Sequence, residues 1–166
     1  DSDDIWYKDK LLEQLNFMLR NNFEFTYTGY LTFKTKGSLL KEHNELNTIM
    51  PPKKFNFNTF IKNTSIGTST MIIKKNLIKN VNFTNTKICE DYYFKCKLLK
   101  KIEYAYCVPK ILTKYRIRPD SLQSNKLKNF YWIWYINKNY NQFNFFKNLM
   151  SILCISISSL KKYGFK

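Results

Sequence analysis

A cluster of carboxylates at the start of the chain, Asp1-Ser2-Asp3-Asp4, constrains the sequence more than any other feature. In an extended segment successive side chains alternate faces, so Asp1 and Asp3 point the same way. If this pair lies in a cleft, a divalent cation relieves the repulsion, and Mg²⁺ or Mn²⁺ fills its other positions with phosphate oxygens and water. Asp4 is then expected to be the N-cap of the next helix. The alternative is that the whole cluster is an acidic helix start that complements the dipole, and the spacing alone leaves both open.

The first part of the chain reads as a helix followed by a strand. From Lys8 to Arg20 a helix is predicted, because its apolar residues fall on one face (Leu11, Leu12, Leu15, Met18 and Leu19). Residues 24–33 alternate and predict a strand. Residues 34–52 are polar and end in Pro51-Pro52, which favours a loop with at most a short irregular strand, and His43 is interpreted as a solvated loop residue. A short helix is expected over residues 55–60.

Two later segments carry residue types suited to a binding site. Gly67-Thr68-Ser69-Thr70 combines Gly with small hydroxyl side chains, which lets the backbone approach a ligand closely, and it leads into a predicted strand at 71–73. Glu90-Asp91 opens a predicted helix, where the dipole favours an ionised carboxylate. An ionised Asp91 can act as a general base, or it can simply charge the helix N-terminus, and position alone does not decide between these.

Alternating residues then predict two strands, one over 102–108 that Pro109 closes and one over 111–117. Arg116 on the second strand is able to clamp a diphosphate with two parallel hydrogen bonds. The alternative is a surface cation on an edge strand.

These motifs occur in a known order. Three groups of residues resemble the family 2 glycosyltransferases over about residues 1–125. The first is Asp1-Ser2-Asp3-Asp4-Ile5-Trp6 with Lys10-Leu11 and Glu13-Gln14-Leu15. The second is Gly67 to Lys74 with Phe83 and Glu90 to Phe94, and the third is Tyr115-Arg116-Ile117-Arg118 with Ser121-Leu122. The resemblance implies an α/β chain, the C-terminal part of a GT-A (Rossmann-like) mixed-sheet domain with a helical C-terminal tail. It also implies that the N-terminal nucleotide-binding half, roughly 90 residues long, is absent, so that the fragment alone is inactive.

The resemblance assigns roles to individual residues. Asp3 and Asp1 form an Asp-x-Asp motif that holds Mn²⁺ or Mg²⁺ on a nucleotide-diphosphate sugar, with Asp1, Arg116 and Arg118 on the donor side. Thr68, Ser69, Thr70 and Glu90 lie on the acceptor side, and Asp91 is the catalytic base. Arg118 stands where many relatives carry a metal-ligating His, and because Arg cannot ligate a cation it is expected to contact phosphate.

The same resemblance implies the reaction and its setting. The enzyme is expected to be inverting. It is also expected to be non-processive, since the Gln-x-x-Arg-Trp motif of processive relatives is absent. It is expected to transfer a sugar to a glycan or lipid-linked acceptor in bacterial cell-envelope polysaccharide synthesis. The expected location is the cytoplasm, including the inner face of the plasma membrane.

Residues 126–166 differ in character from residues 1–125. They hold a dense aromatic run at 130–135 and a mostly apolar run at 149–160 that is too short to span a bilayer. With Lys147, Lys161 and Lys162 around it, the second run is typical of an interfacial helix on anionic headgroups, and equally of a helix packed on the catalytic domain.

Bulk properties allow two rival functions. The net charge of +16 and the 17% aromatic content suit a nucleic-acid-binding domain, although that does not explain the paired acidic motifs and no nucleic-acid partner is expected. A noncatalytic interaction module would leave Asp1, Asp3 and Asp91 freely replaceable. Four cysteines without C-x-x-C spacing make a zinc site improbable and favour reduced thiols.

Overall fold

The computed structural model describes residues 3–35, 43–118 and 125–163. The elements are, in order, β1 (Ile5–Trp6), α1 (Lys10–Arg20), β2 (Phe25–Thr35), β3 (His43–Ile49), β4 (Lys54–Phe55), α2 (Phe57–Phe60), the 3₁₀ turn η1 (Thr68–Thr70), β5 (Ile72–Ile73), α3 (Lys75–Ile78), α4 (Glu90–Leu99), β6 (Ala105–Arg116), α5 (Lys126–Asn139) and α6 (Phe145–Tyr163).

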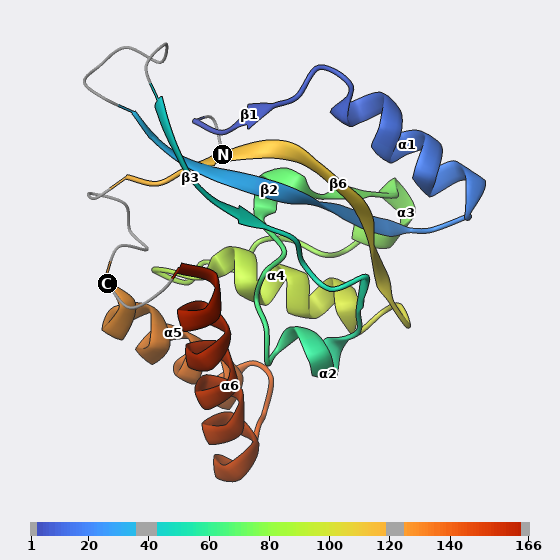
Figure 1. The fold of residues 1–166 in the computed structure, drawn as a ribbon. Helices are drawn as coiled ribbons and strands as arrows, with labels where there is room; N and C mark the ends of the chain where they lie inside the picture. Colours follow the sequence, from blue (N-terminus) through green and yellow to red (C-terminus); the bar gives the residue numbers. More distant parts are fainter. Residues whose placement is uncertain (1–2, 36–42, 119–124, 164–166) are drawn as a thin grey trace.

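A mixed sheet organises the described residues. Its strand order is β1-β6-β2-β3, with β4 added to β6 and β5 added to β2. The two long strands β2 and β6 run parallel, and the other pairs are antiparallel. Figure 1 shows α1 on one side of this sheet and α4 with the α5–α6 pair on the other. The mixed α/β architecture with a helical C-terminal part is the one that the sequence predicts.

The core joins the C-terminal helices to the rest of the domain. Leu98 of α4, Ile136 of α5 and Ile155 of α6 belong to one buried cluster that also contains Phe60 of α2. Because that cluster crosses the boundary at residue 126, α5 and α6 are part of the same packed body as the sheet.

A buried chain of hydrogen bonds fixes α6 against this core. The Tyr92 hydroxyl donates to Asn137 Oδ1 at 2.8 Å, and Asn137 Nδ2 donates to Ser151 Oγ at 3.1 Å. Ser151 Oγ in turn donates to the carbonyl oxygen of Ile61 at 2.6 Å. Buried polar groups cost free energy unless they are paired, so this chain determines which face of α6 turns inward.

The region after residue 33 differs from the prediction of a loop. β2 continues to Thr35, and β3 is a full strand whose first residue, His43, pairs with Thr35. The Thr32 hydroxyl donates to the carbonyl oxygen of Asn47 at 3.0 Å and accepts from the Asn47 backbone N–H at 2.9 Å. A polar strand held by such contacts lacks the alternating apolar signal, which is why the pattern missed it. The short helix α3 was not predicted either.

The two strands predicted around Pro109 are one continuous strand, β6. The pairing of β6 with β2 shifts there, because Thr28 pairs with Val108 while Gly29 pairs with Ile111. Pro109 and the next residue are exposed in the resulting bulge. Proline has no N–H to donate, and a bulge removes the need for one, so the strand continues past it.

Helix α1 buries a different face from the one that the amphipathic pattern predicts. Its buried residues are Lys10, Gln14 and Met18. Four of the five residues of the predicted core face are instead exposed: Leu11, Leu12, Leu15 and Leu19, with Leu19 at 70%. The reason is polar pairing beneath the helix, where Lys10 Nζ donates to Gln14 Oε1 at 3.0 Å and lies 3.9 Å above the Trp6 ring.

Candidate functional site

The turn η1 connects two segments that are far apart in sequence. The Ser69 hydroxyl donates to Asp4, and the carbonyl oxygen of Ser69 accepts from Trp6 Nε1 at 2.8 Å. The Thr68 hydroxyl donates to Asp91 Oδ2 at 3.2 Å. One tight turn therefore joins the N-terminal acidic segment to the start of α4.

The third residue of the turn, Thr70, is held by a hydrogen bond from Gln14 of α1. Gln14 Nε2 donates to the carbonyl oxygen of Thr70 at 2.9 Å and to Thr26 Oγ1 at 3.2 Å. Gln14 and Thr26 are both fully buried. Burial makes these bonds expensive to break, so the helix α1 and the central strand β2 hold η1 in place.

Asp91 lies at the N-terminus of α4 with 27% of its side chain exposed. Its Oδ2 accepts a second hydrogen bond, from Lys95 Nζ at 2.8 Å, and the Lys95 side chain is only 5% exposed. Burial by itself raises the pKa of Asp91, but the Lys95 charge and hydrogen bond, helped by Thr68, outweigh it and hold the pKa below its usual value. The carboxylate is therefore ionised at neutral pH, as a general base requires.

The two residues before Asp91 differ from it in charge or in exposure. Burial, aided by the Asp91 charge, raises the pKa of the Cys89 thiol to about 12, so the thiol stays protonated beside the carboxylate. Glu90 precedes Asp91 and is exposed at the start of the helix. Asp91 is thus the carboxylate of this pair that the fold partly encloses.

Asp4 is a structural residue rather than the predicted N-cap of α1, whose N-cap position is Asp9. One of its oxygens accepts from Ser69, and the other accepts from the backbone N–H of Arg116 at 2.9 Å. Burial raises the pKa of Asp4, although these two hydrogen bonds act against the rise. Both oxygens are engaged in fixing β6 and η1 around the acidic segment, and the strand β1 separates Asp4 from the start of α1.

Asp3 forms an ion pair with Arg118, which lies two residues beyond the end of β6. Arg118 Nε is 3.4 Å from Asp3 Oδ2, and the two side chains are 49% and 24% exposed. Arg116 is the last residue of β6 and is partly exposed. The Arg118 guanidinium therefore stands beside the carboxylate that the motif assigns to a metal.

Asp3 fits a metal that is shared with a phosphate ligand. Magnesium is commonly held by one or two carboxylates together with substrate phosphates, and Asp3 supplies one partly exposed carboxylate. Asp1, the second predicted ligand, lies outside the described residues. Within the described ranges, no group of three or more His, Cys, Asp or Glu side chains could hold a metal ion by itself.

The direct contacts pair Asp3 with Arg118 and Asp91 with Thr68, and Ser69, next to Thr68, joins this second pair to Asp4. Sequence reasoning missed Lys95, the residue closest to the charge of Asp91. The signal was available, because residues four apart on a helix are neighbours and a Lys at that spacing pairs with an acid. It also missed the anchoring role of Gln14, for which a single sequence offers no signal.

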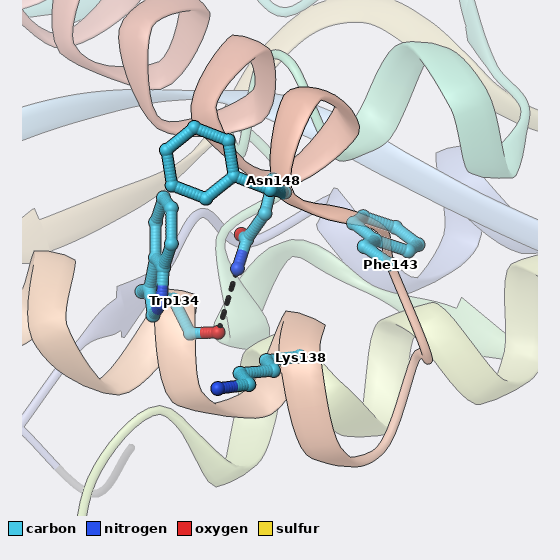
Figure 2. A pocket seen from close by; sticks show the side chains of 5 residues that line it. Trp134, Lys138, Phe143 and Asn148 are labelled. Atoms are coloured by element: carbon cyan, nitrogen blue, oxygen red, sulfur yellow. Dashed lines mark hydrogen bonds between the residues drawn. The ribbon is translucent and has the colours of Figure 1, made fainter.

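A separate cavity lies between α5 and α6 (Figure 2). It has a volume of about 150 Å³ and is lined by Trp134, Lys138, Phe143, Phe145 and Asn148. Figure 2 shows the hydrogen bond from Asn148 Nδ2 to the Trp134 carbonyl oxygen, at 3.0 Å, on its wall. None of the predicted site residues lines this cavity.

The described residues form a mixed α/β protein, and comparison with known proteins finds that its relatives are glycosyltransferases. The chain is 30% identical over 162 residues to a Bacillus subtilis protein named as a teichuronic acid biosynthesis glycosyltransferase, TuaG, covering 98% of this chain and 62% of the relative. It is 29% identical over 167 residues to the Escherichia coli UDP-Glc:alpha-D-GlcNAc-diphosphoundecaprenol beta-1,3-glucosyltransferase WfgD, covering 99% and 62%. A second Escherichia coli enzyme of that activity, WfaP, is 28% identical over 128 residues, covering 77% and 48%.

The chain is therefore homologous to bacterial glycosyltransferases along almost its whole length, which confirms its resemblance to the family 2 enzymes. It spans about 62% of the length of the first two relatives. No family model matches the chain. The relatives do not favour the nucleic-acid-binding alternative.

Among the helices that the structure describes, none is long and apolar enough to cross a membrane.

Proposed function

We propose that this chain carries the catalytic and acceptor-binding part of a glycosyltransferase that moves a sugar from a nucleotide-diphosphate donor to a glycan or lipid-linked acceptor. The observation that carries the proposal is the turn η1, which ties the acidic segment at Asp4 to the enclosed carboxylate of Asp91. A donor held at the acidic segment and an acceptor at Thr68 would meet between them. The homology to bacterial glycosyltransferases supports the same reaction class.

The proposed chemistry is a single displacement with inversion. The acceptor oxygen forms a bond to the anomeric carbon while the bond from that carbon to the diphosphate oxygen breaks, and the electron pair leaves with the diphosphate. The acceptor proton passes to Asp91, which is ionised and hydrogen-bonded to Thr68. Lys95 keeps the carboxylate in one orientation before the acceptor arrives.

Asp3 and Asp1 would hold Mn²⁺ or Mg²⁺ on the donor diphosphate, where the ion supplies Lewis-acid neutralisation of the leaving group. Arg118, beside Asp3, adds positive charge on the same side, and Arg116, two residues earlier in the chain, is the last residue of β6. A guanidinium can bind a diphosphate with two parallel hydrogen bonds, so both arginines suit the stabilisation of the departing charge.

The proposed setting is cell-envelope polysaccharide synthesis at the inner face of the plasma membrane, with the protein in peripheral contact with anionic lipid. Two of the relatives are named for a diphosphoundecaprenol-linked acceptor, which is a membrane lipid. A lipid-linked acceptor would require the site to approach the membrane surface.

The test is Asp91→Asn in the full-length protein, with transfer from a nucleotide-diphosphate sugar measured by product formation. Asn keeps the size of the side chain but cannot take the acceptor proton, so kcat should fall by about 10²- to 10⁴-fold. Donor affinity should hardly change, since the donor is assigned to Asp3 and the arginines.

Glu103→Gln, which removes an exposed carboxylate elsewhere, is the matched control and should retain wild-type kcat. A near-normal kcat in Asp91→Asn would end the assignment of Asp91 as the base.

A further inference from the structure

Helix α6 turns buried polar residues inward together with Ile155, and it turns a row of apolar residues outward. The inward side includes Asn148 and Ser151, each 1% exposed, with Ser151 held in the buried hydrogen-bond chain to Ile61. The outward side is a row of large apolar residues, called here the α6 stripe: Phe146, Met150, Leu153, Ile157 and Leu160. Their exposed fractions are 76%, 53%, 49%, 54% and 38%.

The spacing of the α6 stripe keeps it on one line. Its members follow one another by four, three, four and three residues, which is the repeat that holds side chains on a single helix face. A helix of 19 residues is about 28 Å long, so the stripe extends over most of that length. The buried hydrogen bonds on the opposite face prevent the helix from rotating to hide it.

The charged residues of the C-terminal part of the chain, which contains α6, have one sign. From residue 121 to the end the chain contains no Asp and no Glu. It contains seven lysines in the same stretch: Lys126, Lys128, Lys138, Lys147, Lys161, Lys162 and Lys166. An apolar helix face on a segment whose charged residues are all cations is complementary to a surface that is apolar beneath and anionic above.

We propose that the α6 stripe is the surface by which this protein lies on an anionic lipid membrane. This inference rests on the proposed function, which includes contact with a membrane. It adds which side chains enter the bilayer. The apolar residues of the stripe insert to the level of the acyl chains, while Lys161 beside them faces the headgroups. The helix lies parallel to the surface, since no described helix crosses it.

A second copy of the chain fits the α6 stripe less well. Self-pairing of α6 would bring two sets of lysines together with no carboxylate in either helix to offset them. Like charges without compensation oppose association, whereas anionic headgroups are attracted to each added lysine.

The proposal is tested by co-sedimentation of the full-length protein with vesicles of phosphatidylcholine, with and without phosphatidylglycerol. Binding should require the anionic lipid and should weaken when salt is raised. Met150→Ser with Ile157→Ser removes two half-exposed members of the stripe and should lower the partition coefficient roughly 30-fold.

Leu12→Ser with Leu19→Ser is the matched control, because these residues are as exposed but lie on α1, across the sheet from α6 (Figure 1). The control pair should leave vesicle binding unchanged within about twofold. Equal losses in the two double variants, or equal binding to vesicles without anionic lipid, would overturn the assignment to α6.

Two further measurements separate the other outcomes. A wild-type dimer in sedimentation equilibrium that the α6 double variant abolishes, without any vesicle binding, would mean that a second copy occupies the stripe. Sugar transfer to a water-soluble acceptor should be the same in wild type and in the α6 variant. If transfer is absent while vesicle binding holds, the proposed function fails and the membrane surface stands.

Discussion

Lys95→Met is the perturbation that tests the site most directly. Lys95 is almost fully buried, and its ammonium is the strongest partner of Asp91, 2.8 Å from Oδ2. Methionine has nearly the same volume and fills the space of the lysine stem, so the change removes the charge and the hydrogen bond without opening a large cavity. Thr68 would remain as a partner of the Asp91 carboxylate.

The expected cost follows from the burial of the two groups. Removing one partner of a fully buried ion pair typically costs about 3–5 kcal/mol, because the other charge is left uncompensated. The Asp91 side chain is 27% exposed and keeps its bond to Thr68, so water and the hydroxyl recover part of this. We expect the free energy of unfolding at pH 7 to fall by about 1–3 kcal/mol.

The effect depends on pH in a definite direction. In the wild type the pKa of Asp91 lies below its usual value, so its contribution to stability is complete above the unfolded pKa of about 3.9 and is lost as pH falls through the folded pKa. In Lys95→Met burial is no longer outweighed, which raises the pKa of Asp91. The stability difference between the two proteins should therefore be largest near neutral pH and shrink under acid.

The assays are urea unfolding at several pH values and the pH profile of kcat. The acidic limb of the profile should move to higher pH in Lys95→Met, since the base is protonated sooner, while a purely structural lysine would change stability alone. Lys101→Met, at an exposed lysine just after α4, is the control and should leave both quantities near wild type. An unchanged acidic limb together with unchanged stability would refute the argument that Lys95 sets the charge of Asp91.

Two other perturbations have defined outcomes. Asp3→Asn, or a chelator added to wild type, should lower transfer by several orders of magnitude in an assay of product formation, and full activity in chelator would remove the metal from the mechanism. Gln14→Leu should reduce the free energy of unfolding by about 1–3 kcal/mol in urea titrations, because Lys10 and the carbonyl oxygen of Thr70 lose a buried partner. Wild-type stability in Gln14→Leu would show that these bonds contribute little.

Local chemistry was sufficient to predict several parts of the molecule. The alternation of residues 24–33 gave the central strand β2, and Glu90-Asp91 was correctly placed at the start of a helix. The segment from Gly67 to Thr70 was predicted to lead into a strand, and β5 follows it, while its predicted approach to a ligand stays a prediction. These features are local, since they depend on side-chain period and on the preferences of helix ends and turns.

Other features depended on partners that are remote in sequence. The apolar residues of α1 point outward because Gln14 finds buried partners on β2 and η1, which a helical wheel does not register. Asp4 became a support for Ser69 and Arg116, which lie 65 and 112 residues away from it. β6 continued through Pro109 because β2 accommodates a bulge at that point.

The sequence by itself determined the identity and order of the acidic, hydroxyl and basic motifs, the central strand and the position of Asp91 at a helix start. The tertiary structure alone decided which of these side chains meet, and which faces of α1 and α6 are buried. The physical reason is that periodicity reports how apolar a face is, whereas burial also depends on whether polar groups on that face find partners. On α1 and α6 the buried polar side chains are paired across the fold, and most of the large apolar side chains face outward as a result.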